Sequence, residues 1–275
     1  MDVNAIDWKG SQTITRGTEY AISRCPILNR VYWRYSPTFY EWRIGCSVNN
    51  TAPLNLLKIV WVNPEQMSKF SGRSGLIYDR WEDIGKIKDG NWDKRLPPDL
   101  VNKDADYREN LFFGSTIEET IQYQSFDAHF TDGTSWENTE LFQRFLTGIN
   151  NGRSVWKGCQ SKNDLFQRCQ HMDELYQKIQ NKGFKTQLEL FEEDGLKPHH
   201  VGFLDLLTDE ITVDIGRKGE LLFVDGRHRL CIAKILNLDA IPVFILVRHQ
   251  KWFEKRERIY QTNNFDSVQH PDIAE

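Results

Sequence analysis

A run of apolar residues at helical spacing is the clearest hydrophobic pattern along the chain. Between Leu165 and Ile179 apolar residues recur every three or four positions, which predicts a helix. Asp164 near its start and Gly183 just past its end are typical helix boundaries. A second helix is predicted over residues 141–149, because apolar positions at helical spacing follow a capping-box pattern at 134–137.

Shorter apolar runs predict strands. The strongest candidates are residues 56–62, a hairpin over 211–224, and the continuous apolar run 241–247. Aromatic and β-branched residues also predict strands over 30–35, 39–44 and 185–191. Pro64, at a first helical position, indicates a short helix over residues 64–70.

These elements predict an α+β fold with a mixed sheet and a large helical and loop-rich insertion. Glycines and a proline pair make residues 71–110 especially loop-rich. The expected organisation is a β-rich N-terminal extension at 1–53, a core at 54–250 with the insertion at about 71–205, and a charged C-terminal tail at 251–275.

The most informative segment is a charged turn between a predicted strand and a predicted helix. The apolar residues 221–224 run directly into Asp225, Gly226, Arg227, His228 and Arg229. We refer to these five residues as the 225–229 turn. Apolar positions at helical spacing begin at Leu230, so the turn lies at a helix N-terminus.

The chemistry of this turn suits an anion. Two guanidiniums, an imidazole and free backbone N–H groups would share a helix N-terminus, where the helix dipole favours negative charge. Asp225 adds a hard oxygen ligand for a metal, or a base. Phosphate together with a metal ion is the ligand that this combination predicts. In the alternative, the arginines only form salt bridges with a neighbouring surface.

Two other acids are candidates for the same chemistry. Asp93 and Glu137 each lie next to a tryptophan in a polar loop. Such a pair either anchors a loop through a buried indole or presents an acid at a cleft. A basic cluster over residues 248–258 is interleaved with glutamates, which favours a solvated helix face over contact with phosphate or nucleic acid.

Composition narrows the class of protein. The 275 residues carry a net charge of −4, so any contact with nucleic acid needs a local basic patch. No apolar run is long enough for a membrane span, and the polar N-terminus predicts no secretory signal. The five cysteines lack metal-binding spacing and indicate reduced thiols, so we expect a cytoplasmic protein with no membrane partner.

The segment from about 210 to 255 resembles the core of the ParB/sulfiredoxin-like superfamily. Members carry a Gly-x-x-Arg turn before a helix, then a return strand with Ile-Pro-Val, as at Gly226, Arg229 and residues 241–243 here. The turn is most similar to the Asp-Gly-His-His-Arg form of the free serine kinases, with Arg227 in place of the first histidine. The strand at 57–62 resembles the opening strand of the family.

The resemblance implies a ParB/sulfiredoxin-like mixed-sheet core and a nucleotide site. In such proteins the turn holds the phosphates of ATP, ADP or CTP. Gly226, Arg227, His228 and Arg229 would then bind phosphate, and Asp225 would hold Mg²⁺ or assist the acceptor hydroxyl. Sulfiredoxin chemistry is not expected, because Arg227 occupies the position of its cysteine. Partition function is not expected either. The helix-turn-helix DNA-binding domain that usually follows the core has no room in the about 28 residues after Val247.

We therefore expect a nucleotide-binding phosphotransferase, or a nucleotide hydrolase, that acts on a small hydroxyl-bearing acceptor with ATP or another nucleoside phosphate and Mg²⁺. Its catalytic residues would be Asp225 and His228, with Asp93 or Glu137 as a second carboxylate. One alternative is a ParB-like metal-dependent nuclease or DNA-binding protein. Another is a non-catalytic protein that senses a nucleotide.

Overall fold

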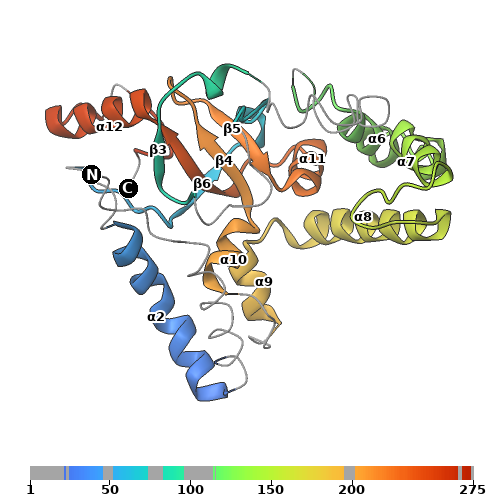
Figure 1. Cartoon of the computed structure of the whole chain (residues 1–275), viewed down its shortest axis with the longest axis horizontal. Coiled ribbons are helices and arrows are strands. Elements are labelled where there is room, and N and C mark those ends of the chain that lie inside the picture. Colours follow the sequence, from blue (N-terminus) through green and yellow to red (C-terminus); the bar gives the residue numbers. More distant parts are fainter. Residues whose placement is uncertain are drawn as a thin grey trace.

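The structure is a computed structural model, and it describes residues 22, 25–45, 52–73, 83–95, 114, 116–194, 202–265 and 268–273. Its centre is a mixed six-stranded sheet with helices around it, as expected for an α+β fold. Figure 1 shows one group of helices beside the sheet and a second group below it. Within the described ranges, no helix is both long enough and apolar enough to cross a bilayer.

The sheet is built from strands β1 (Ile59–Val62), β2 (Lys69–Phe70), β3 (Lys86–Lys88), β4 (Ile211–Ile215), β5 (Leu221–Asp225) and β6 (Ile241–His249). The strands are ordered β1-β6-β4-β5-β2, and β3 also pairs with β6. β4 runs parallel to one edge of β6. The other edge of β6 is shared: β1 pairs antiparallel with its first half and β3 pairs parallel with its last three residues.

β6 separates two hydrophobic cores. All nine of its residues are buried, as its continuous apolar sequence predicts. Because successive side chains point to opposite faces of a sheet, Val243 and Ile245 pack into one core while Phe244 and Leu246 pack into the other. The predicted strands at 211–215, 221–224 and 241–247 are thus confirmed.

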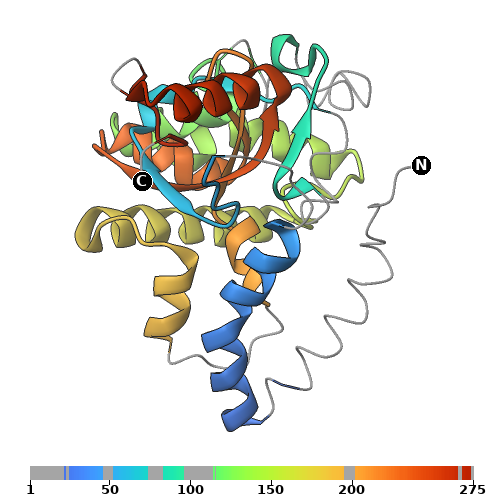
Figure 2. The same cartoon turned by 90° about the vertical axis from the view of Figure 1, so that its left-hand side faces the viewer.

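Eight helices surround the sheet. They are α2 (Pro26–Gly45), α6 (Ile121–Phe130), α7 (Glu140–Asn150), α8 (Lys162–Lys182), α9 (Gln187–Glu193), α10 (Phe203–Thr208), α11 (Arg227–Ile235) and α12 (Gln250–Thr262) within the described part of the chain. α6, α7 and α8 form a lobe next to α11, while α2, α9 and α10 extend below the sheet (Figures 1 and 2). α12 covers the far side of the sheet from this lobe.

The two helices predicted in the middle of the chain are confirmed as α7 and α8. Ser161 caps α8, and its hydroxyl and the Asp164 carboxylate complete a reciprocal capping box. Gly183 ends the helix with a positive φ of 76°, which glycine adopts without strain.

Several strand predictions are wrong. Residues 30–35 and 39–44 lie in the helix α2, so residues 26–45 of the N-terminal extension are helical and not β-rich. Residues 1–21, 23, 24 and 46–51 lie outside the described residues. Residues 187–193 of the predicted strand 185–191 form α9 instead. Thr186 and Glu189 make a capping box there, which favours a helix start over the strand propensity of the segment.

Three boundaries also differ. The helix predicted over 64–70 is a three-residue 3-10 turn, Pro64–Gln66, followed by β2. β3 lies inside the expected insertion yet belongs to the sheet. The charged C-terminal region begins with the helix α12, where Trp252 is buried and donates a 2.9 Å hydrogen bond to Asp272.

Candidate anion-binding site

The 225–229 turn joins β5 to α11 through a glycine that no other residue replaces easily. Gly226 adopts a left-handed conformation, with φ of 94°. A Cβ atom at this position would lie 2.8 Å from Cα of Ile211 on the neighbouring strand. Asp225 ends β5, and its Oδ1 accepts a 2.7 Å hydrogen bond from the N–H of Gly226. The turn is therefore held closely against the sheet.

His228 is fixed by an indole from the helical lobe. Nε1 of Trp156 donates a 3.0 Å hydrogen bond to Nε2 of His228. A neutral imidazole has one acceptor and one donor nitrogen, so this bond leaves the proton on Nδ1. The His228 ring also stacks on Phe126 of α6, with ring centroids 5.9 Å apart.

The His228 imidazole is kept neutral by its surroundings. Burial lowers its pKa to about 3, and the positive charges of nearby cations add to the effect. Those cations are Arg168, Arg227, Lys157 and Arg229. His228 therefore serves as a hydrogen-bonding group of fixed tautomer at neutral pH, and not as an acid that releases a proton there.

Two of these cations come from the lobe and not from the turn. Arg168 lies on α8, with its guanidinium 5.8 Å from the Trp156 ring. Its buried Nε has no hydrogen-bond partner among the residues described here. Lys157 is exposed and follows Trp156 directly. No local sequence pattern indicates this contribution, because the two residues lie about 60 to 70 positions before the turn.

A strained loop brings Trp156 and Lys157 to the site. Val155 and Cys159 exchange backbone hydrogen bonds of 2.9 and 2.7 Å, and the three residues between them close a tight turn. Trp156 and Lys157 both have positive φ, 39° and 60°, as the central residues of a type I′ turn do. Non-glycine residues rarely adopt this conformation, and such strain tends to occur at functional sites.

Arg229 contacts the end of α10 and the start of β4. Its Nη1 lies 3.4 Å from Oε2 of Glu210, and its Nη2 donates to the carbonyl of Asp209. Burial raises the pKa of Glu210 to about 7, although a backbone N–H from Gln187 and the charge of Arg229 act in the opposite direction. Glu210 therefore neutralises Arg229 only in part near neutral pH.

Arg227 and Cys231 lie on the inner side of α11. The Arg227 guanidinium lies over the Phe223 ring, 5.9 Å from its centroid. Burial lowers its pKa to about 10. Cys231 is fully buried, and burial raises the pKa of its thiol to about 12, so it is a packing residue and not a nucleophile.

The structure does not bring Asp93 to the turn. Its carboxylate pairs with Arg217 at 2.5 Å, in the loop between β4 and β5. That loop is at the opposite end of β5 from Asp225. Burial raises the pKa of Asp93, but hydrogen bonds from Arg217 outweigh this effect and hold the pKa below its usual value. The Asp93 carboxylate therefore anchors a loop beside the buried indole of Trp92.

Glu137 is also engaged elsewhere. It lies in the 3-10 turn Trp136–Asn138, and its carboxylate forms a 2.8 Å ion pair with Lys162 at the start of α8. The indole of Trp136 packs edge-on against Phe126, so this turn supports the aromatic cluster under His228. Trp136 therefore contributes to the site, whereas the Glu137 carboxylate pairs with Lys162.

A metal ion at this site would have to be held by Asp225. Among the described residues, no group of three or more His, Cys, Asp or Glu side chains is arranged to hold a metal ion. Mg²⁺ usually binds one or two carboxylates and completes its shell with water and substrate phosphates. The half-buried Asp225, next to the cationic residues of the turn, fits that mode of binding.

Comparison with known proteins identifies no relative. No family model, curated protein sequence or solved structure matches this chain.

Proposed function

We propose that the protein binds a nucleoside phosphate with Mg²⁺ at the 225–229 turn and transfers a phosphoryl group to a small hydroxyl-bearing acceptor, or hydrolyses the nucleotide. The observation that carries this proposal is the convergence of four cations around one neutral imidazole. Arg227 and Arg229 come from the turn, and Lys157 and Arg168 come from the lobe. The resemblance of the turn to ParB/sulfiredoxin-like proteins supports the same ligand.

The charge balance of the site supports a polyanionic ligand. The four cations lie near the carboxylates of Asp225, Asp209 and Glu210, and that of Glu210 is partly protonated near neutral pH. Guanidiniums suit phosphate because they can donate two parallel hydrogen bonds to it. A phosphate chain at the start of α11 would also receive backbone N–H groups and the positive end of the helix dipole.

Each residue of the turn has a role in this proposal. Arg227, Arg229 and Arg168 would neutralise the charge that develops during phosphoryl transfer. His228 would donate through Nδ1, since Nε2 accepts from Trp156. Asp225 would hold Mg²⁺ or accept the proton of the acceptor hydroxyl. Bound Mg²⁺ would supply additional charge neutralisation at the phosphates.

A second candidate function is nucleotide binding without turnover. Asp93 and Glu137, the acids expected to complete a catalytic site, are engaged by Arg217 and Lys162. A protein in which Asp225 acts alone could bind a nucleotide and change its affinity for a partner without chemistry. Phosphate release separates this candidate from the first.

The test is a thermal-unfolding screen with ATP, ADP, CTP and GTP, each with and without Mg²⁺. We expect at least one nucleotide to raise the melting temperature of the wild type, and Arg168→Ala and Lys157→Ala to reduce that rise. The matched control is Lys178→Ala, an exposed lysine further along α8. Phosphate release and transfer of a labelled γ-phosphate are measured on the same proteins.

Each outcome has a clear meaning. The proposal is wrong if no nucleotide changes the melting temperature of the wild type. A rise that Arg168→Ala and Lys157→Ala retain as fully as Lys178→Ala would show that the nucleotide binds elsewhere. A rise without phosphate release or transfer would favour the non-catalytic function.

A further inference from the structure

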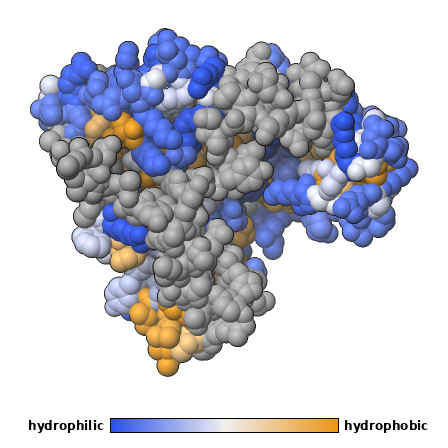
Figure 3. All heavy atoms as spheres, viewed as in Figure 1, coloured by the Kyte–Doolittle hydropathy of each residue, from blue (hydrophilic) through white to orange (hydrophobic). Residues whose placement is uncertain are grey.

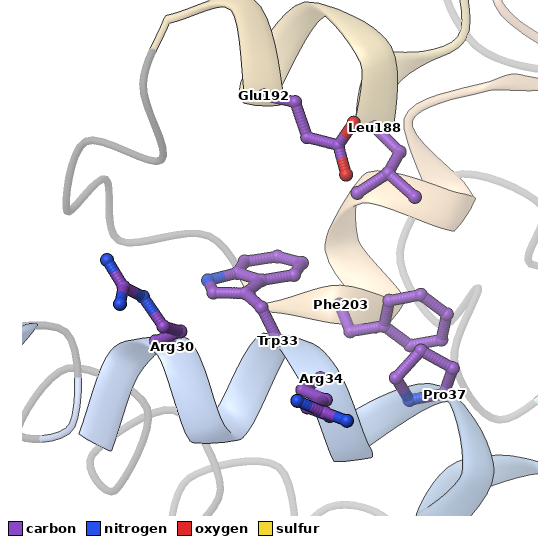
Figure 4. A pocket seen from close by; sticks show the side chains of 7 residues that line it. All are labelled: Arg30, Trp33, Arg34, Pro37, Leu188, Glu192 and Phe203. Atoms are coloured by element: carbon purple, nitrogen blue, oxygen red, sulfur yellow. The ribbon is translucent and has the colours of Figure 1, made fainter. Parts of the chain in front are cut away.

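Helices α2, α9 and α10 form a pocket of about 260 Å³ below the sheet (Figures 1 and 4). None of the residues that line it belongs to the 225–229 turn. A cavity of about 150 Å³ can hold a benzene ring, so this pocket has room for one ring or branched chain with a short polar group. It is smaller than the sites of roughly 300–1,000 Å³ that hold larger ligands, so it does not suit a nucleotide. The pocket is therefore a second candidate site, for a smaller molecule.

The two faces of α2 have different surroundings. Ile27 and Leu28 are exposed near the start of this helix, and Figure 3 shows apolar side chains at the lower tip of the molecule, where α2 begins. On the inward face, the ring of Trp33 instead packs 4.6 Å from that of Phe191 on α9. The pocket lies on this inward face, so packing between helices fixes its walls.

Two hydrogen bonds fix the aromatic part of the pocket. The hydroxyl of Tyr32 accepts a 2.9 Å hydrogen bond from the N–H of Phe203 at the start of α10. Nε1 of Trp33 donates a 3.1 Å hydrogen bond to Oδ1 of Asn29, one turn earlier in α2. Because its one polar atom is bound within α2, the indole presents only carbon atoms to the pocket. The other apolar lining residues are Pro37 and Leu188.

The charged lining residues come from facing helices. Arg30 and Arg34 are four positions apart, on one face of α2, while Glu192 belongs to α9. Among the described residues, the side chains of Arg30 and Glu192 form neither a hydrogen bond nor an ion pair, and the Arg34 guanidinium lies 5.8 Å from the centroid of the Tyr35 ring. Figure 4 shows the Glu192 carboxylate pointing from α9 toward the Trp33 indole. The pocket thus has a basic wall, an acidic wall and an apolar surface between them.

We propose that this pocket binds a free α-amino acid with an apolar side chain. The carboxylate of such a zwitterion would bind the guanidiniums of Arg30 and Arg34. Its ammonium would bind the Glu192 carboxylate and the face of the Trp33 indole. Its side chain would cover the apolar surface at Phe203. The volume of the pocket limits this ligand to a single amino acid.

Ligands with one charge fit less well. A carboxylate without an amine would place a negative charge in the pocket with no partner for Glu192, and an amine without a carboxylate would place a positive charge beside Arg30 and Arg34. Because these three side chains are exposed, water and salt screen their charges. We therefore expect a dissociation constant on the order of 0.1–1 mM.

Isothermal titration calorimetry of the full chain, without nucleotide or Mg²⁺, tests the proposal. The probes are L-phenylalanine and L-leucine, each compared with the analogue that lacks its amine and the one that lacks its carboxylate. For phenylalanine these analogues are 3-phenylpropanoate and 2-phenylethylamine. We expect at least one of the amino acids to bind, and its two analogues to bind about fivefold more weakly or worse. Since no nucleotide is present, the result does not depend on the function proposed for the 225–229 turn.

Glutamine substitutions test the two walls separately. Arg30→Gln and Glu192→Gln should each weaken binding of the amino acid about fivefold. The matched controls Arg258→Gln and Glu174→Gln remove the same charges at exposed positions on α12 and α8, and should leave binding unchanged. Glu192→Gln should at the same time strengthen binding of the analogue that lacks the amine, because it removes the repulsion. A folding defect cannot produce these opposite changes.

Three results would overturn the proposal. One is a wild type that binds neither amino acid at millimolar concentrations. Another is binding that Arg30→Gln and Glu192→Gln retain as fully as their controls, which would place the ligand elsewhere. The third is an analogue with one charge that binds as tightly as the amino acid, which would show that the pocket does not recognise a zwitterion.

Discussion

The indole N–H of Trp156 donates a 3.0 Å hydrogen bond to Nε2 of His228, although the two residues lie 72 positions apart in the chain. This contact fixes the tautomer of the imidazole. It also joins the loop before α8 to the start of α11, so the lobe and the 225–229 turn form one site.

Replacement of the indole donor tests this contact. Trp156→Phe keeps a ring against Phe145, whose centroid lies 5.1 Å away, but leaves Nε2 of His228 buried without a donor. We expect a loss of about 1–3 kcal/mol in the free energy of unfolding, the usual cost of a buried group left without its partner. Urea denaturation measures it. Trp61→Phe, at an exposed indole, should change the stability by much less.

The low pKa of His228 makes stability depend on pH. Its pKa is about 3 in the folded chain, below its ordinary value of 6.5. Below pH 6.5 the unfolded chain therefore binds a proton that the folded chain does not, and stability falls as pH falls toward 3. The slope reaches at most about 1.4 kcal/mol per pH unit. The difference between wild type and His228→Gln, measured from pH 4 to 7, should show this slope.

The matched histidine variant is His171→Gln, at an exposed position on α8. A wild type that differs from His228→Gln by the same amount at pH 4 and pH 7 would contradict a buried neutral imidazole. Nitrogen chemical shifts of His228 would separately report the proton on Nδ1.

Alanine substitutions at Gly226 and Gly133 distinguish the cost of close packing from the cost of backbone strain. Both have positive φ, 94° and 73°, but a Cβ at Gly226 meets Ile211 at 2.8 Å and a Cβ at Gly133 meets nothing within 4 Å. Gly133→Ala should cost about 1 kcal/mol from the left-handed backbone alone. Gly226→Ala should cost clearly more and should reduce the nucleotide-induced rise in melting temperature. Equal costs for the two variants would show that the turn can move away from β4.

Asp93 should matter for stability and not for binding. Asp93→Ala removes the carboxylate partner of Arg217, whose Nη2 keeps Gly90 and Asn91 as acceptors, and we expect a lower free energy of unfolding. The rise in melting temperature on addition of nucleotide should be retained. Asp89→Ala, at a side chain that is 75% exposed, is the control for loss of a charge in the same loop. Loss of phosphoryl transfer without loss of stability in Asp93→Ala would restore its catalytic role.

Local sequence signals predicted four of the six strands, but not β2, β3 or the N-terminal helix. Strand residues such as Val243 to Leu246 are apolar on both sides because both faces of β6 are covered, and this shows directly in the sequence. Val31 and Tyr35 also have strand propensity, yet they lie in α2. There the packing of Tyr40 under the sheet overrides local preference. In α9 the capping pair Thr186 and Glu189 indicates a helix start, but the prediction followed the strand propensity of the segment.

The chemistry of the site was predictable only where it is local. The positions of Gly226 and Arg227 at the start of α11 follow from a strand, a turn and a helix in sequence. The contributions of Trp156 and Arg168 depend on how α8 packs beside α11. No short sequence pattern predicts this packing. Asp93 was expected to act as a second carboxylate beside the 225–229 turn, but it pairs with Arg217 at the other end of β5.

The ion pair between Arg229 and Glu210 has a thermodynamic consequence. A phosphate bound by Arg229 would weaken the attraction that lowers the pKa of Glu210 and would add a negative charge nearby, so this pKa would rise above its value of about 7. Binding near neutral pH would therefore take up a proton, and by linkage the affinity would increase as the solution becomes more acidic. In titration calorimetry the measured heat would then vary with the ionisation enthalpy of the buffer. Glu210 would thus couple ligand occupancy to the proton concentration around the protein.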